Sequence, residues 1–126
     1  METYQPVPKF FNINKVPKIG KSCSLVDTLL DCAEQITIGD FVSFGHGCMV
    51  LTGQHDYRFK GEERQKKSNN YPVTIEDGVW IASGVIICPG VTIGENSVIG
   101  AGSVVTCNIP ANVLVAGVPA RIIKTV

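Results

Sequence analysis

Two histidines, His46 and His55, are the side chains of this sequence best suited to accept a proton near neutral pH. A neutral imidazole can take the proton that a hydroxyl or an amine loses as it attacks a carbonyl carbon. His55 stands near the start of a polar stretch, residues 54–72, with the sequence QHDYRFKGEERQKKSNNYP. We therefore predict that His55 is a general base, with an exposed loop histidine of no catalytic role as the alternative. His46 is expected to be a surface or inter-subunit histidine.

Other charged residues near this stretch could assist His55 or contact a substrate. Asp56 and Glu34 could orient the imidazole or bind an acceptor, but exposed, solvated carboxylates are the favoured interpretation. Basic residues outnumber acidic ones in the stretch and could meet a phosphate group, although a solvated surface is favoured. These basic residues are Arg58, Lys60, Arg64, Lys66 and Lys67, against Asp56, Glu62 and Glu63.

The five cysteines indicate neither a metal site nor a disulfide framework. No CxxC pair occurs, and the cysteines and histidines fall at none of the usual zinc-ligand spacings. The first residues lack a basic start followed by an apolar run, so no secretory signal is expected. We therefore predict reduced thiols, no metal and a cytoplasmic protein. The cysteines are Cys23, Cys32, Cys48, Cys88 and Cys107.

Length and composition predict one small domain over residues 1–126, with 44% hydrophobic residues for its core. Lys and Arg total 11, and Asp and Glu also total 11. This balance gives no electrostatic signature for nucleic acid or for an anionic membrane surface. No apolar stretch approaches the roughly 18 residues that a membrane span needs.

A six-residue repeat governs most of the chain. From position 75, every sixth residue is a β-branched aliphatic, and a second series of small or β-branched residues precedes it by two positions. The first series is Ile75, Ile81, Ile87, Ile93, Ile99 and Val105, and the second is Val73, Val79, Val85, Val91, Ser97 and Ser103. An earlier block has Ile38, Phe44 and Val50, preceded by Ile36, Val42 and Cys48. A weaker series, Ile13, Ile19 and Leu25, precedes that block, and its register slips within 26–35.

A strict period of six fits neither an α-helix nor an ordinary alternating strand. It fits a short strand followed by a corner, in a chain that winds as a three-sided coil of about 18 residues per turn. Equivalent residues then stack in parallel ladders about 4.8 Å apart. The sequence therefore predicts an all-β triangular prism, with a β-sandwich as the alternative. The stretch 54–72 must leave the prism as an extruded loop, because its charges cannot enter the core.

Residues 71–123, together with the upstream motifs TIGDFVSFGHG and LTGQHDY, resemble the hexapeptide-repeat acyltransferases. The resemblance covers about residues 36–124 and is to the maltose, galactoside and polysaccharide O-acetyltransferase branch. It implies a left-handed parallel β-helix and a homotrimer with active sites between neighbouring prisms. The maltose and galactoside enzymes carry a helical N-terminal extension that has no counterpart in this sequence, so the acceptor sugar is left open.

The resemblance also implies roles for individual residues. The general base of the family is a histidine at the start of this loop, which corresponds to His55. The positions that match the acetyl-CoA site of the family are Trp80, Ser83, Ala101, Thr106, Arg121 and Lys124. Cys107 stands where the branch often has lysine, so one phosphate contact is expected to be missing, and Lys124 stands where it often has arginine. The corner geometry of any β-helix is the alternative explanation for the small residues.

The function implied is acetyl-CoA-dependent transfer of an acetyl group to a hydroxyl of a sugar or saccharide. N-acetylation of a nucleotide-linked amino sugar and acetylation of a small antibiotic are the alternatives. A γ-class carbonic anhydrase would need three histidines around zinc, and the chain has two. An ice-binding face would need threonines on every coil, whereas Thr74, Thr92 and Thr106 do not recur regularly. A non-catalytic scaffold would leave His55 unexplained.

Overall fold

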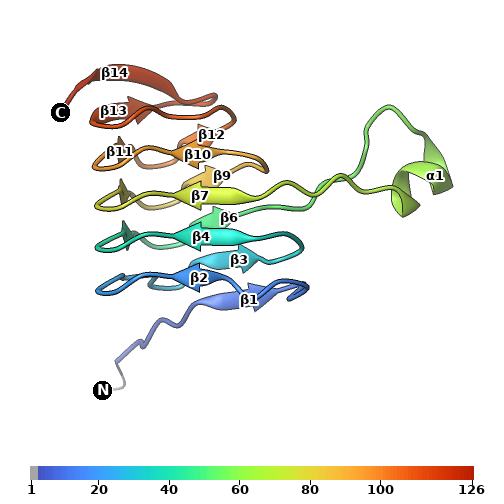
Figure 1. The fold of residues 1–126 in the computed structure, drawn as a ribbon, viewed down its shortest axis with the longest axis horizontal. Helices are drawn as coiled ribbons and strands as arrows, with labels where there is room; N and C mark the ends of the chain where they lie inside the picture. Colours follow the sequence, from blue (N-terminus) through green and yellow to red (C-terminus); the bar gives the residue numbers. More distant parts are fainter. Residues whose placement is uncertain (1–2) are drawn as a thin grey trace.

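The structure, a computed structural model, describes residues 3–126, which wind as a three-sided prism with one projecting arm (Figure 1). The first face contains β1 (Lys9–Phe11), β3 (Leu29–Asp31), β6 (Met49–Val50), β9 (Ile86–Ile87) and β12 (Val104–Val105). The second face contains β2 (Lys18–Ile19), β4 (Ile36–Ile38), β7 (Val73–Ile75) and β10 (Thr92–Ile93). The third face contains β5 (Ser43–Phe44), β8 (Trp80–Ile81), β11 (Val98–Ile99), β13 (Val113–Ala116) and β14 (Arg121–Thr125).

The main hexapeptide series stacks in three columns inside the prism. The columns contain Ile38, Ile75 and Ile93; Phe44, Ile81 and Ile99; and Val50, Ile87 and Val105. All nine side chains are buried, as are the six residues of the second series between 73 and 103. Each face thus contributes one inward-facing pair per turn, which explains the period of six. The predicted all-β coil is confirmed, and the alternative of a β-sandwich with antiparallel sheets is wrong.

The weaker amino-terminal repeat forms one further coil below the main core. Phe10 of β1 pairs with Leu30 of β3, and Ile19 of β2 pairs with Ile38 of β4. The hexapeptide phase is unclear in residues 1–10, and the structure shows that Lys9 and Phe10, with Phe11, form the strand that completes this coil. Residues 1–2 lie outside the part of the chain that the structure describes.

The predicted slip of register within residues 26–35 is confirmed. Inward-facing residues are normally six positions apart, but only five positions separate Leu25 from Leu30, and eight separate Leu30 from Ile38. The shorter of these two segments, from Leu25 to Leu30, contains Val26, whose φ of 55° allows a tighter corner. The longer segment, from Leu30 to Ile38, accommodates its extra residues around Cys32, which is buried.

The carboxyl-terminal end of the prism is closed by β14. This strand runs antiparallel to β13, with Ala116 paired to Arg121 and Val113 paired to Thr125. Gly117 makes the reversal possible with a φ of 103°, a backbone conformation that side chains with a Cβ rarely adopt. All five residues of β14 are exposed.

The arm, residues 52–71, leaves the prism after β6 and returns to it before β7 (Figure 1). Its base is a two-stranded antiparallel ladder. The backbone N–H of Tyr71 donates to Thr52 O at 2.8 Å, and that of Asn69 donates to Gln54 O at 2.8 Å. Its tip carries the short helix α1 (Gly61–Lys66), none of whose residues is buried. The prediction that this stretch is extruded is therefore confirmed.

Candidate active site

Two edges of the prism carry several of the residues that the sequence predicted to be functional. The small-residue corner joins the third face to the first and contains residues 45–46, 83–84, 101–102 and 116–117. Its layers are stacked closely, because Gly84 N donates to His46 O at 2.8 Å and Gly102 N donates to Ser83 O at 2.9 Å. The arm corner joins the first face to the second and contains Leu51, Cys88 and Thr106, in successive layers. The arm leaves the prism at the arm corner.

His55 lies in the base of the arm and is exposed. It forms an antiparallel bridge with Ser68 on the returning segment. Its Nδ1 lies 3.3 Å from the carbonyl oxygen of Lys67. A carbonyl oxygen can only accept a hydrogen bond, so a neutral imidazole that makes this bond carries its proton on Nδ1 and its lone pair on Nε2. That is the tautomer that a general base at this position would need.

Asp56 is buried, with 6% of its surface exposed, so the expectation of a solvated carboxylate is wrong. Its carboxylate accepts Arg58 Nε at 2.8 Å, Arg58 Nη2 at 2.5 Å and Asn69 Nδ2 at 3.1 Å. These contacts, the Arg58 side chain foremost, hold the pKa of Asp56 well below its usual range. The carboxylate thus fastens the two segments of the arm and keeps its charge in mildly acidic solution.

Glu34 lies on the prism below the arm and is also paired. Its carboxylate lies 2.5 Å from Lys15 Nζ and accepts the backbone N–H of Gln35 at 2.8 Å. The hydrogen bond from Lys15 is the main reason that the pKa of Glu34 is lowered. Among the hydrogen bonds of residues 3–126, none joins Glu34 or the Asp56 carboxylate to the His55 ring. Neither acid orients the imidazole by direct contact.

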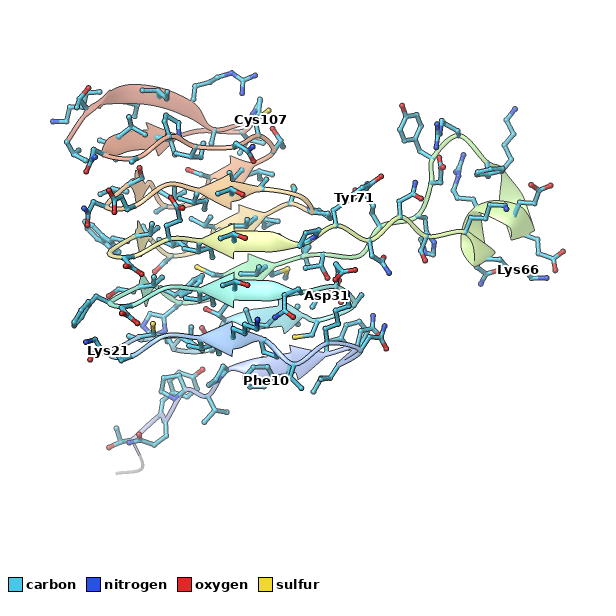
Figure 2. The ribbon with its side chains drawn as sticks, viewed as in Figure 1. Phe10, Lys21, Asp31, Lys66, Tyr71 and Cys107 are labelled. Carbon is cyan, nitrogen blue, oxygen red and sulfur yellow. The ribbon has the colours of Figure 1, made fainter. Side chains whose placement is uncertain are left out.

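An open pocket of about 420 Å³, here called the arm pocket, lies between the amino-terminal coil and the base of the arm. His55 lines it together with Asp31, Asn12 and Phe11. Figure 2 shows Asp31 on the edge of the prism beside the base of the arm. Asp31 is 7% exposed, and its carboxylate accepts the backbone N–H of Gly53 at 3.0 Å, a bond that ties the prism to the arm.

Asp31 is a candidate functional residue that the sequence analysis missed. It belongs to the stretch 26–35, where the hexapeptide phase fails and no face can be assigned from spacing. Its signal was an acidic residue directly after the aliphatic pair Leu29 and Leu30, at the end of a strand. Only the stacking of β3 under β6 shows that this position lies next to the arm.

The six positions predicted to contact acetyl-CoA do not gather at one place in a single prism. Ser83 and Ala101 lie on the small-residue corner, whereas Thr106 lies on the arm corner. Ala101 and Thr106 stand at opposite ends of β12, on two different corners of the prism. Trp80, 55% exposed, faces outward from the third face, and the remaining two positions, Arg121 and Lys124, lie on β14.

The corner glycine Gly45 shows how closely the layers approach at the small-residue corner. A Cβ at this position would lie 2.6 Å from the backbone nitrogen of Ser83, which leaves no room for a side chain. Ser83 Oγ in turn accepts the backbone N–H of His46 at 3.0 Å. His46 itself is exposed at this corner, in agreement with the prediction of a surface position.

Comparison with known proteins identifies the family. Residues 72–107 match the sequence model of the bacterial transferase hexapeptide (six repeats). A maltose O-acetyltransferase from Clostridium difficile 630 has a similar structure, with a TM-score of 0.67 and 31% identity over 93% of this chain and 70% of that one. The chain belongs to the hexapeptide-repeat acyltransferase family. Its coil is therefore the left-handed parallel β-helix that the resemblance implied.

Two further relatives support the same branch of the hexapeptide-repeat acyltransferases. Galactoside O-acetyltransferase from Escherichia coli (strain K12) is 48% identical over 95 residues, which are 72% of this chain and 44% of that protein. A hexapeptide-repeat acetyltransferase from Vibrio cholerae, solved with acetyl coenzyme A, has a TM-score of 0.85 and 36% identity, over 92% of this chain and 63% of that one. The chain thus spans less than half the length of the curated relatives that it matches.

Three general features complete the description of the site. Within residues 3–126, no three His, Cys, Asp or Glu side chains gather closely enough to hold a metal ion. No helix in this part of the chain has the length and apolar character needed to cross a membrane. All five cysteines are free thiols.

Proposed function

We propose that this chain transfers the acetyl group of acetyl-CoA to a hydroxyl of a sugar or saccharide. The observation that carries the proposal is His55, which stands in a polar pocket with Nδ1 bound to a carbonyl and Nε2 free. Membership of the hexapeptide-repeat acyltransferases supports the same reaction. The free thiols further support a reducing compartment, which we take to be the cytoplasm.

His55 would act directly on the acceptor. Its Nε2 takes the hydroxyl proton while the acceptor oxygen forms a bond to the carbonyl carbon of the thioester. The imidazolium that results is stabilised by its Nδ1–H bond to the Lys67 carbonyl. As the C–S bond breaks, His55 gives the proton to the departing thiolate, and the neutral imidazole is restored. The route needs no acyl-enzyme.

The small-residue corner fits an extended thioester substrate such as acetyl-CoA. Ser83, Gly84, Ala101 and Gly102 are exposed there, and their short side chains leave the backbone open to hydrogen bonding. Backbone N–H groups at such a corner could stabilise the oxyanion that forms during attack. The exposed cations of β14, Arg121 and Lys124, suit the nucleotide phosphates.

The arm pocket fits a saccharide. Asp31 and Asn12 provide a carboxylate and an amide beside His55. Both kinds of group are able to hydrogen-bond to sugar hydroxyls. Phe11, 58% exposed, offers an apolar surface against which a sugar ring can lie. An acceptor held by these groups would bring one hydroxyl to Nε2 of His55.

We also propose that the active unit is a homotrimer. The small-residue corner and the arm corner are separate edges of one prism, so a site that uses both needs the edge of a neighbour. Three prisms around a threefold axis would place these two edges against each other at three equivalent positions. The arm supports this arrangement, because it projects away from its own prism and Tyr57 on it is 82% exposed.

Thiol release from acetyl-CoA, measured with a panel of sugars, nucleotide sugars and amino sugars, tests the reaction. We expect release with at least one saccharide, and we expect His55→Ala to lower turnover by roughly 10²–10⁴. Exposed Cys107 also reacts with thiol reagents, so each rate is read against a sample without acceptor.

Gln65→Ala is the matched control, since this exposed residue of α1 lies away from the arm pocket and should leave turnover unchanged. Unchanged turnover of His55→Ala, with fold and assembly intact, would remove His55 from the mechanism. Release only with amino sugars would replace O-acetylation by N-acetylation.

A further inference from the structure

The base of the arm is a two-stranded ladder with two different faces. His55 bridges Ser68 across it, and the backbone N–H of Asn69 donates to Gln54 O at 2.8 Å. Because successive residues of a strand point to opposite faces, His55 and Ser68 share one face, and Gln54 and Asn69 share the other. The face with His55 lines the arm pocket. The acetyl transfer proposed for His55 leaves the opposite face without a ligand.

A second pocket, of about 270 Å³, lies on this opposite face. It is here called the tyrosine pocket, because Tyr57 and Tyr71 line it with exposed fractions of 82% and 46%. Figure 2 shows Tyr71 and Asp31, a residue of the arm pocket, on opposite sides of the base of the arm. Gln54 and His55 line both pockets, so the two pockets meet along the outgoing segment of the arm.

The tyrosine pocket offers polar groups that have no partner within residues 3–126. No hydrogen bond of this part of the chain uses the side-chain amide of Gln54 or the hydroxyls of Tyr57 and Tyr71. Arg58 binds through Nε and Nη2, which leaves its Nη1 available. Amides, hydroxyls and guanidinium groups hydrogen-bond to sugar hydroxyls, and an exposed aromatic ring packs against the apolar face of a sugar.

The charges that line the tyrosine pocket cancel each other. Arg58 is the only lysine or arginine of its lining, and the guanidinium is bound to Asp56 at 2.8 Å and 2.5 Å. Because these bonds lower the pKa of Asp56, the carboxylate stays ionised at neutral pH. A phosphate would meet an arginine that is already paired. An uncharged ligand rich in hydroxyl groups therefore fits the pocket better than the pyrophosphate of a nucleotide sugar.

We propose that the tyrosine pocket is a second sugar subsite, which holds the unit next to the one that is acetylated. This inference rests on the acetyl transfer proposed for His55, and it makes the preferred acceptor an oligosaccharide. The reacting sugar lies in the arm pocket, and the chain passes Gln54 so that the next ring lies against Tyr71. The thioester substrate approaches from the small-residue corner of the neighbouring prism, so the two substrates do not compete for one pocket.

Saccharide binding to the purified full chain, without acetyl-CoA, tests the second subsite. The probes are three series of mono-, di- and trisaccharides: glucose to maltotriose, galactose to β-1,4-galactotriose, and N-acetylglucosamine to its β-1,4-linked trimer. In at least one series we expect the disaccharide to bind about tenfold more tightly than the monosaccharide by saturation-transfer NMR, because the second ring gains the contact with Tyr71. Equal affinities within every series, or no binding at all, would overturn the proposal.

Variants of Tyr71 locate the gain in affinity. Tyr71→Ala should reduce the affinity for the disaccharide to that for the monosaccharide, which should itself stay unchanged, because the backbone N–H still binds Thr52 O. Tyr71→Phe keeps the ring and should retain most of the gain. Tyr4→Ala removes a tyrosine that is 67% exposed at the amino-terminal end and is the matched control. Equal losses for both saccharides in Tyr71→Ala would show a role in folding the arm, and the proposal would be wrong.

Three further results would assign the tyrosine pocket to another occupant and would contradict the proposal. One is a nucleotide sugar that binds more tightly than the disaccharide and weakens with salt. Another is a higher KM for acetyl-CoA in Tyr71→Ala with unchanged saccharide binding. The third is a change of assembly in Tyr71→Ala by light scattering, because a second copy would then cover the pocket. Tighter binding of the disaccharide without any thiol release would instead support the subsite and refute the acetyl transfer.

Discussion

The carbonyl oxygen of Lys67 connects the candidate base to the buried carboxylate of the arm. It lies 3.3 Å from His55 Nδ1 and also accepts the backbone N–H of Asp56 at 3.3 Å. The Asp56 carboxylate accepts a hydrogen bond from the side chain of Asn69, two residues beyond Lys67, and another from the side chain of Arg58. Asp56 therefore fixes the segment that carries the carbonyl, and through it the imidazole. We propose that it is a positioning residue, which acts on the reaction only through His55.

Asp56→Asn tests this role. The amide would place an N–H group against the donors of Arg58 and Asn69, so the arm should loosen and kcat should fall about tenfold. KM for acetyl-CoA should change little, because the Asp56 carboxylate is buried and its hydrogen bonds go to Arg58 and Asn69 within the arm. In the His55→Ala background the same substitution should cost nothing further, since there is no imidazole left to position.

Steady-state kinetics of the four proteins of this double-mutant cycle measure the coupling. Glu62→Gln is the matched control in the arm, because its exposed pair with Lys66 at 2.7 Å contributes little. Equal losses from Asp56→Asn with and without His55 would show that the carboxylate acts on the fold and not on the base.

For single residues, the sequence predicts where a residue lies in the fold better than which side chains it contacts. His55 could be singled out because it stands where the repeat stops and the polar stretch begins. The burial of Asp56 could not be predicted, because it depends on hydrogen bonds from the Arg58 side chain and from Asn69 on the other segment of the arm. The many charged residues of 54–72 suggested that Asp56 is exposed to solvent, but the antiparallel ladder at the base of the arm buries its carboxylate.

At the scale of the strands, two serines replace the aliphatic residues of the inward series and bind backbone instead. Ser97 Oγ donates to Pro110 O at 2.6 Å and accepts the backbone N–H of Val113 at 3.2 Å. Ser103 Oγ donates to Gly100 O at 2.6 Å and accepts the backbone N–H of Gly117 at 3.3 Å. Both serines lie in the coils where the spacing shortens before β13, so the hydroxyls satisfy backbone groups that the regular ladder leaves free.

Ser97→Ala should lower the free energy of unfolding by about 1–3 kcal/mol, because the buried N–H of Val113 loses its partner. Urea denaturation of the purified chain measures the change. Ser24→Ala, at an exposed serine of the amino-terminal coil, is the control and should stay within about 0.5 kcal/mol of the unmodified chain. Equal stability of Ser97→Ala and the unmodified chain would contradict the bonding role.

The elements show where periodicity stops being informative. From Val73 to Val105 the six-residue period predicts each strand and its inward face correctly, because every coil repeats the one below it. The direction of β14 did not follow from the repeat, since an antiparallel strand depends on the turn at Gly117 and on pairing with β13. The helix α1 also lay outside the repeat, and its strongest local signal is the i,i+4 pair of Glu62 and Lys66.

At the scale of the whole molecule, the regular coil separates two groups of residues that the proposed acetyl transfer would use together. One prism presents His55 and Asp31 at the arm corner and an open backbone at the small-residue corner, on the two ends of the first face. The face is rigid, because its strands are held in ladders above and below. To bring the two corners of one chain together, the coil would have to break, whereas a neighbouring prism can supply the second corner without any rearrangement.

Light scattering should accordingly give a mass of about 40 kDa, three times the 13.5 kDa of one chain.

Mixing of two inactive variants tests whether one site uses two chains. His55→Ala removes the base at the arm corner, and Ala101→Glu places a bulky anion on the small-residue corner where the thioester substrate is proposed to lie. Each variant alone should be inactive. In randomly mixed trimers, roughly a quarter of the sites would join an intact arm corner to an intact small-residue corner of the neighbour, and activity should return to that extent. A mixture of His55→Ala with His55→Gln, both altered at the same corner, should stay inactive. If the first mixture also stays inactive although the chains exchange, both edges must belong to one chain, and the shared site is wrong.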